Sequence, residues 1–271
     1  MPTFLTAYRW ELRKLVSQKR TYLGLGATIA VPLIFVTALS LQSGSPNDVA
    51  FGKYVRESGL AIPLVLLLFA SVWLFPLVTA LVAGDIIASE HHNGTLKTIL
   101  TRSLDRGQIF LAKLLAAATY ALLALLLMGG VALIAGTLKS GFNSLTSLSG
   151  TQVSAGRGLV LIGASFAVYL MPTMAVVCIG LFLSAVTRNS AAAVVGTLMS
   201  ALLMQLIGIL PGLGGADPYL LTTQFQAWQG FFQVPTDWVP ITRAAWVCAI
   251  YAVPLGVAAY LIFLRRDVAG G

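Results

Sequence analysis

The residues best suited to chemistry in this sequence are the consecutive Glu90, His91 and His92. A carboxylate beside two imidazoles could bind a metal ion or transfer protons. Neighbouring residues of a helix point about 100° apart, however, so the three side chains do not converge on one ion. The zinc-protease pattern His-Glu-x-x-His is absent, and the chain has no other histidine. The triplet therefore favours a loop or interface role over catalysis or a metal site.

A nucleotide-binding P-loop is also missing from the sequence. That motif needs Gly-x-x-x-x-Gly-Lys-Ser/Thr, so that backbone N–H groups can surround the phosphates. The one Gly-Lys pair is Gly52-Lys53, with Asn47 where the first glycine should stand and Tyr54 after the lysine. We therefore expect a chain that binds no cofactor and has no ATPase site, and so is not an enzyme by itself.

The composition indicates a membrane protein. Hydrophobic residues make up 58% of the chain and charged residues 10%, with a mean hydropathy of +0.88, whereas a soluble domain has about 25% charged residues. Uncharged stretches long enough for a helix to cross a bilayer occur six times. We expect an all-α integral membrane protein, one membrane domain over residues 1–271, with six transmembrane helices at 22–41, 60–83, 114–138, 158–186, 191–210 and 244–264.

Basic residues predict how the chain lies in the cell membrane. With six spans both termini share one side, and only five of the 17 basic residues fall on the other side: Lys53, Arg56, Lys139, Arg157 and Arg243. Positive charge concentrates in cytoplasmic segments, so both termini are expected in the cytoplasm. The net charge of +8 is then a signal of topology, and we expect no nucleic-acid partner.

No predicted span contains a carboxylate or a basic side chain, and the most polar residue inside one is Gln205. Ion-coupled carriers usually have charged residues at membrane depth. Their lack here argues against a proton antiporter and suggests that driving energy enters from elsewhere. Gln205 could bond a neighbouring helix or line a transport path, and helix packing is the favoured reading.

Two segments outside the spans carry membrane signals. Residues 3–20 predict an amphipathic interfacial helix, although a simple basic flank explains them as well. Its apolar positions are Phe4, Leu5, Tyr8, Leu12, Leu15 and Val16. Residues 211–243 are rich in aromatic residues and predict one or two short re-entrant helices in the outer leaflet. These aromatics are read as interfacial anchors in preference to substrate contacts.

Residues 84–113, GDIIASEHHNGTLKTILTRSLDRGQIFLAK, resemble the cytoplasmic connection between the second and third spans of ABC type-2 exporter permeases. The matching residues are Glu90, Gly94-Thr95-Leu96, Ile99-Leu100-Thr101, Arg106 and Lys113, while Ser103 stands where that family often has proline. Residues 11–15 (ELRKL) and 218–223 (PYLLTT) are also similar to parts of such permeases.

The resemblance implies a transport mechanism. It makes the segment around residues 86–101 a coupling helix that docks on a cytoplasmic ABC ATPase subunit, where ATP and magnesium bind. The implied coupling residues are Ile87, Glu90, Gly94, Thr95, Leu96, Lys97, Leu100, Arg102 and Arg106. It also implies pairing with a second permease copy, a homodimer being simpler than a heterodimer, and export of a lipophilic or amphipathic substrate. The alternatives are a non-ABC membrane carrier, or a scaffold for membrane assembly.

Overall fold

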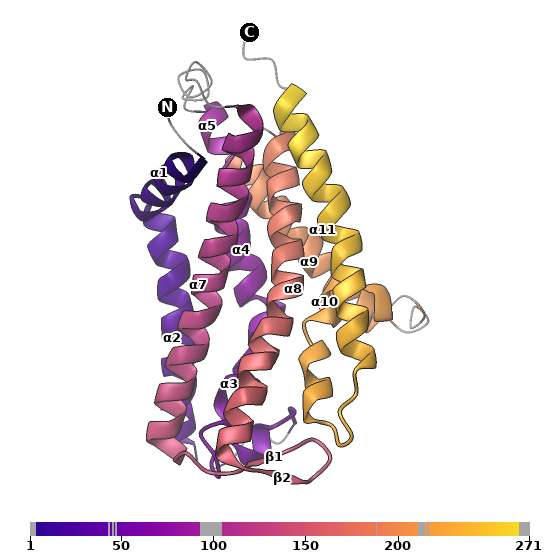
Figure 1. Ribbon diagram of the computed structural model, residues 1–271. Helices are drawn as coiled ribbons and strands as arrows, with labels where there is room; N and C mark the ends of the chain where they lie inside the picture. The colour runs from indigo at the N-terminus through magenta and orange to yellow at the C-terminus, as the bar shows by residue number, and fades with distance from the viewer. Residues whose placement is uncertain are drawn as a thin grey trace.

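The computed structural model describes residues 4–42, 44, 46, 48–92, 105–187, 189–210, 215 and 217–265. It is an elongated helical bundle (Figure 1) in which 80% of the described residues are helical. A two-stranded antiparallel hairpin pairs β1 (Leu145–Thr146) with β2 (Gln152–Val153). The expected all-α class is confirmed.

Five helices in the described part of the chain are long and apolar enough to cross a membrane: α2 (Lys19–Leu41), α7 (Arg106–Ser140), α8 (Ala155–Thr187), α9 (Ser190–Ile209) and α11 (Val239–Arg265). The bent pair α3 and α4 makes a sixth if it is one span. Large apolar side chains such as Ile134, Val195 and Ile250 are exposed on the outside of these helices. An apolar outer surface suits lipid, and the chain is a multi-pass membrane protein by this criterion.

The expected single helix over 60–83 is two helices, α3 (Ala61–Val72) and α4 (Leu74–Ala83). The axis of Ala61–Val72 and that of Leu74–Glu90 differ by 58°, and Trp73 lies at the break with φ −128° and ψ −47°. Pro76 supplies a cause, because its ring conflicts with the carbonyl of residue 72 and it has no N–H to donate there.

The remaining long helices extend beyond their predicted spans. At about 1.5 Å per residue, α7 and α8 are each about 50 Å long, against about 30 Å for a hydrocarbon core. Local signals set the ends: Gly141 takes a left-handed φ of 79° after α7, and the Asn189 side chain accepts a hydrogen bond from the N–H of Ala192 at the start of α9. Hydropathy predicts the part of each helix that faces lipid, and not the full length of the helix.

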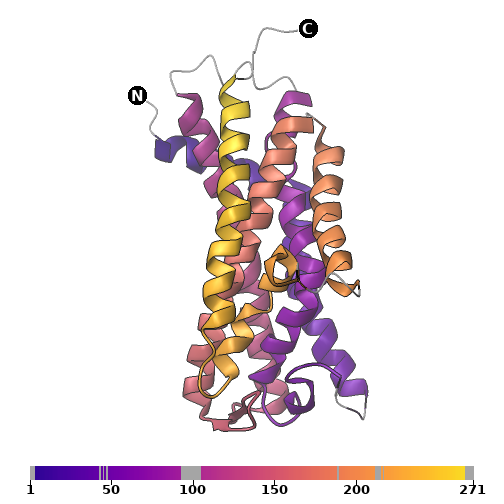
Figure 2. The ribbon, with the colours of Figure 1, turned by 90° about the vertical axis from the view of Figure 1, so that its right-hand side faces the viewer.

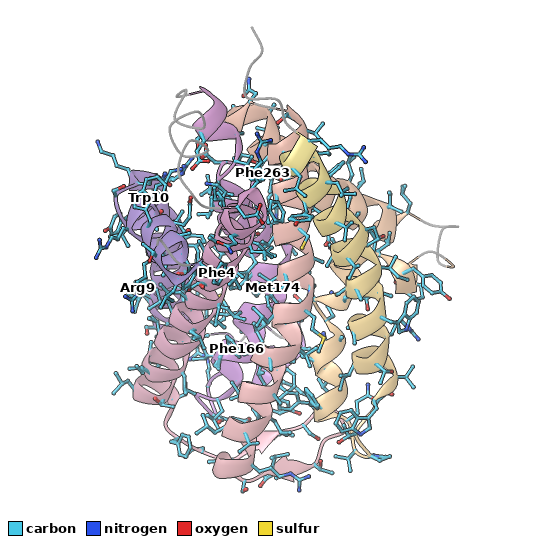
Figure 3. All side chains as sticks on the ribbon, turned by 45° about the horizontal axis from the view of Figure 1, so that its top comes forward. Phe4, Arg9, Trp10, Phe166, Met174 and Phe263 are labelled. Atoms are coloured by element: carbon cyan, nitrogen blue, oxygen red, sulfur yellow. The ribbon has the colours of Figure 1, made fainter. Side chains whose placement is uncertain are left out.

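The N-terminal segment differs from the predicted helix over 3–20. The helix α1 (Phe4–Val16) stops before Ser17, and Gln18 is extended before α2 begins. Its buried residues are Ala7, Glu11 and Leu15, which recur every four positions and pack on α7. The buried face therefore includes the predicted apolar position Leu15 but centres on a carboxylate, while Arg9 and Trp10 point outward (Figure 3).

Both ends of the described chain lie at one end of the bundle, which we call the terminal end (Figures 1 and 2). The helices α2, α7, α8 and α11 lie side by side in Figure 1, with α3, α4 and α9 behind them. Figure 2 shows that α9 stops well short of the far end of the bundle. Three short helices continue from there: η2 (Asp217–Tyr219), α10 (Leu221–Gln224) and η3 (Ala227–Phe232).

Half of the aromatic side chains expected as interfacial anchors are inside the fold. Phe225, Trp228 and Phe232 are buried between α8 and α11. The ring centroids of Trp228 and Phe51 lie 6.1 Å apart. Phe51 belongs to the loop that leads to the short helix η1 (Gly52–Tyr54). The anchor reading is therefore wrong for these three residues, which connect the loops at the far end into one core. Tyr219 and Trp238 remain exposed.

Candidate functional site

A buried lysine lies at the centre of a polar site at the terminal end. Lys113, in the second turn of α7, is fully buried. Its ammonium nitrogen lies 2.8 Å from Oε1 of Glu11 on α1 and 2.5 Å from Oε1 of Glu90 on α5 (Ala88–His92). It also donates to the carbonyl of Ile86 at 3.4 Å. One ammonium group thus joins three segments of the chain.

Lys14 completes this group, because its ammonium pairs with the same Glu90 oxygen. Glu11 and Lys14 are three residues apart and so share one face of α1. We call Glu11, Lys14, Glu90 and Lys113 the charged cluster. Its two acids balance its two bases, which matters because each unpaired buried ion would cost several kcal/mol.

The carboxyl group of Glu90 is held in its ionised form. Burial alone raises the pKa of Glu90, but the positive charges and hydrogen bonds of Lys113 and Lys14 outweigh burial, and the net pKa is lowered. Glu90 is therefore ionised at neutral pH. Such an arrangement suits a permanent connection between helices better than proton transfer.

A second ion pair stands beside the cluster. Asp85 is buried, pairs with Arg20 in the first turn of α2, and accepts a hydrogen bond from the hydroxyl of Ser190 at the start of α9. The backbone N–H groups of Ile87 and Ala88 both donate to the hydroxyl of Ser184 on α8, at 3.2 and 2.9 Å. Residues 85–90 are thus bonded to α1, α2, α7, α8 and α9.

Close helix packing supports the same segment. A Cβ atom added at Gly180 of α8 would lie 2.8 Å from Cβ of Ala83 and 3.1 Å from the backbone nitrogen of Gly84. Gly180 lets α8 approach the end of α4 more closely than a residue with a side chain would allow. This contact puts Ser184, one turn further along α8, within reach of residues 87 and 88.

The predicted coupling residues are placed as follows. Ile87 and Glu90 are buried inside the chain, so neither offers the surface to a partner that the sequence suggested. Arg106, at the start of α7, donates to the carbonyl of Leu264 on α11 at 3.0 Å. Gln205 is partly exposed on α9. Those outside the described residues are Gly94, Thr95, Leu96, Lys97, Leu100 and Arg102.

The described residues contain no group of three or more histidine, cysteine or acidic side chains that could hold a metal ion. The buried acids at this end, Glu11, Asp85 and Glu90, are instead paired with cations. The site's chemistry is therefore that of ion pairing, which fixes the segment before residues 93–104 to five helices.

Sequence reasoning named Glu11, Lys14 and Lys113 only as parts of a resemblance and did not connect them. One signal was available: Glu11 is the single acid among the first 47 residues, which contain five basic residues. An isolated acid on an otherwise basic helix invites a search for a lysine partner. That partner is 102 residues away, so local patterns do not identify it.

The comparison with protein-family models gives a match over most of the chain. The family of proteins of unknown function called DUF2705 matches over residues 30–269, which include Asp85, Glu90 and Lys113. Glu11, Lys14 and Arg20 precede the matched region. A search of curated proteins finds no match. Since the matched region covers most of the sequence, the chain belongs to the DUF2705 family.

Proposed function

We propose that the protein is the membrane-spanning permease subunit of an ABC exporter, with both termini in the cytoplasm of the cell. The proposal begins from the resemblance of residues 84–113 to the coupling region of type-2 exporter permeases. The charged cluster is the structural observation that supports it most, because a coupling element needs a rigid connection to the spans.

Force applied to residues 93–104 by a partner ATPase would reach the spans through residues 85–90. The force would reach α7 through Lys113 and α8 through Ser184. It would reach α2 and α9 through the contacts of Asp85 with Arg20 and Ser190. A helix as long as α7 carries the displacement to the opposite end of the bundle. Binding energy at one site thereby shifts helices at another, as in rigid-body switching.

In this topology α2, the bent pair α3–α4, α7, α8, α9 and α11 are the six spans, and α1 lies in the cytoplasmic interface. Exposed Leu5 and Trp10 on α1 suit that position. Residues 217–232 form the external segment before the last span. A second copy of the chain would complete the path, and the substrate class is lipophilic or amphipathic.

The buried position of Glu90 changes how the ATPase contact should be tested. Reversing its charge would damage the cluster itself, so any loss of partner binding would be ambiguous. Lys97 and Arg102 are better positions, because sequence reasoning assigns them to the partner contact and neither belongs to the cluster. The double variant K97E/R102E reverses two charges there.

We expect the wild-type chain, purified in mild detergent after expression with its genomic neighbours, to carry a P-loop ATPase with vanadate-sensitive hydrolysis. K97E/R102E should lose most of that ATPase while its melting temperature stays the same. The matched control R9E/R13E makes the same charge change at exposed positions of α1 and should keep the partner. If the wild-type chain purifies alone, the exporter proposal fails and a carrier or scaffold takes its place.

A further inference from the structure

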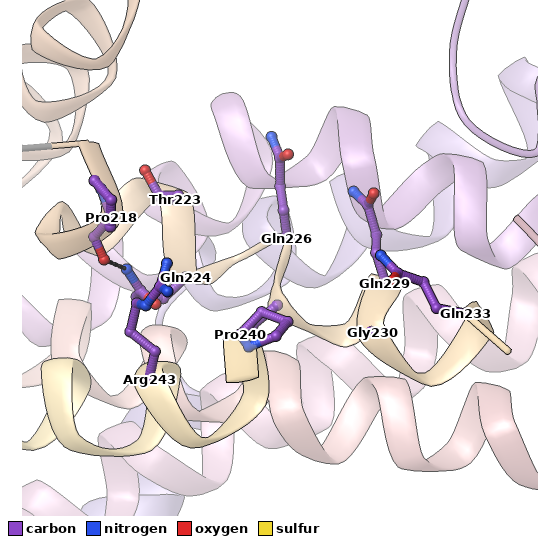
Figure 4. Close-up of a pocket in the computed structure, with 10 residues that line it drawn as sticks. Pro218, Thr223, Gln224, Gln226, Gln229, Gly230, Gln233, Pro240 and Arg243 are labelled. Atoms are coloured by element: carbon purple, nitrogen blue, oxygen red, sulfur yellow. Dashed lines mark hydrogen bonds between the residues drawn. The ribbon is translucent and has the colours of Figure 1, made fainter. Parts of the chain in front are cut away.

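A polar pocket of 220 Å³ opens between α11 and the segment 217–233. The pocket is lined by one threonine, four glutamines and a single charged residue, Arg243 (Figure 4). The threonine and the glutamines are Thr223, Gln224, Gln226, Gln229 and Gln233. Pro218, Gly230 and Pro240 contribute much of the rest. The pocket is smaller than the roughly 300 Å³ of a drug site, which suits a single small group.

The pocket has a net positive charge. Arg243 forms no salt bridge with any residue that the structure describes. The two acids of the segment 217–243 do not line the pocket and have other partners: Oδ1 of Asp217 accepts from the Thr223 hydroxyl, and Oδ1 of Asp237 accepts from the N–H of Val239, each at 2.9 Å. A guanidinium without a carboxylate partner, at the edge of a pocket lined by glutamines, is a binding group for phosphate or carboxylate.

The pocket is also built to stay in shape. Gln224 is buried, and its amide nitrogen donates to the carbonyls of Pro218 and Leu220 at 2.9 and 2.8 Å. The N–H of Asp237 donates to the carbonyl of Gly230 at 3.0 Å. Figure 4 shows Arg243 reaching from α11 toward Gln224. The cation therefore faces a wall whose backbone is fixed by its own hydrogen bonds.

An exposed apolar stripe begins beside this cation. Trp246 follows Arg243 by three residues on α11 and packs against Tyr219, with ring centroids 5.8 Å apart. The stripe continues toward the terminal end at three- and four-residue spacing through Ile250, Val253, Val257 and Leu261, all of them exposed. Tryptophan and tyrosine at the start of such a stripe are typical of the boundary between headgroups and acyl chains.

We propose that this pocket and stripe bind an anionic phospholipid, with its phosphate against Arg243 and an acyl chain along α11. Charge selects the headgroup, and the apolar stripe supplies the contact for the tail. The inference depends on the chain lying in a membrane and not on the exporter proposal, so either can fail without the other.

The test measures lipid binding to the purified chain alone, by native mass spectrometry in detergent with added phosphatidylglycerol or phosphatidylcholine. The wild type should prefer phosphatidylglycerol. Because a charged hydrogen bond contributes more than 1 kcal/mol, R243Q should lower the affinity for phosphatidylglycerol about tenfold and leave phosphatidylcholine unchanged. R243K should keep part of the preference. R157Q removes an exposed cation from the far end of the bundle and should change nothing.

Two outcomes would overturn the proposal. Equal losses in R243Q and R157Q would mean that general surface charge attracts the lipid. Displacement of phosphatidylglycerol by inorganic phosphate at comparable concentration would mean that the pocket holds a free anion and the stripe adds nothing. Melting temperatures of both variants exclude misfolding as the cause, since neither arginine has a salt bridge among the described residues.

Discussion

At the scale of residues, Lys113 has the most demanding position in the molecule. It is a fully buried cation whose ammonium touches two carboxylates from different helices. Replacing a whole buried ion cluster by apolar residues is often harmless, whereas removing one partner leaves uncompensated charge. The cluster therefore makes single and paired substitutions behave differently.

We predict that K113M lowers the free energy of unfolding in detergent by about 3–5 kcal/mol, because Glu11 and Glu90 would share one remaining cation. Thermal unfolding followed by circular dichroism measures this. K139M, at the exposed end of the same helix, is the matched control and should melt like the wild type. Adding E11L to K113M should recover part of the loss. Identical melting of K113M and K139M would show that the cluster contributes nothing to stability.

At the scale of elements, a close helix contact holds α8 against α4. It depends on Gly180, and it places Ser184 where two backbone N–H groups can reach it. Small residues at such contacts replace the hydrophobic driving force that lipid removes from helix association. A larger residue at position 180 would require α8 or α4 to move as a whole, because no flexible side chain lies at this contact.

We predict that G180V destabilises the protein by about 1–3 kcal/mol, the cost typical of overpacking. The new Cβ would lie within 3.1 Å of the backbone nitrogen of Gly84, which cannot move aside like a side chain. G163V is the control on the same helix, because an added Cβ there meets nothing within 4 Å. The same melting temperature for both variants would refute the close contact.

Sequence reasoning was accurate about elements and weak about their connections. Uncharged runs located the spanning helices, because hydropathy reports directly on the lipid-facing surface. The break at Trp73 was missed, although Pro76 was visible. Pro32, Pro172 and Pro254 lie inside continuous helices, so proline by itself does not predict a break. The charged cluster was missed because its partners are 102 and 23 residues apart in sequence.

At the scale of the whole molecule, the two ends of the bundle differ. The terminal end carries the ion pairs, and the far end carries the hairpin of β1 and β2 and the aromatic core around Trp228. The excess of basic residues on the terminal side predicts that this end is cytoplasmic. Labelling of intact cells can determine the orientation directly.

We predict that a membrane-impermeant maleimide labels Q152C in intact cells and S17C only after permeabilisation. Both positions are exposed and lie at opposite ends. Replacing Cys178 and Cys248 by alanine first removes the native thiols. The reverse pattern would invert the proposed orientation. Labelling of both positions in intact cells would mean that the bundle does not separate two compartments.

The charged cluster also constrains the order in which the protein can be made. Glu11 leaves the ribosome 102 residues before Lys113, and Glu90 precedes that lysine by 23. Chains acquire structure from the N-terminus during synthesis. Until α7 arrives, both carboxylates lack the ammonium group that they share, and water is their best environment. The first helix can therefore take its final place only after the start of α7 has emerged, which makes its docking a late step in biogenesis.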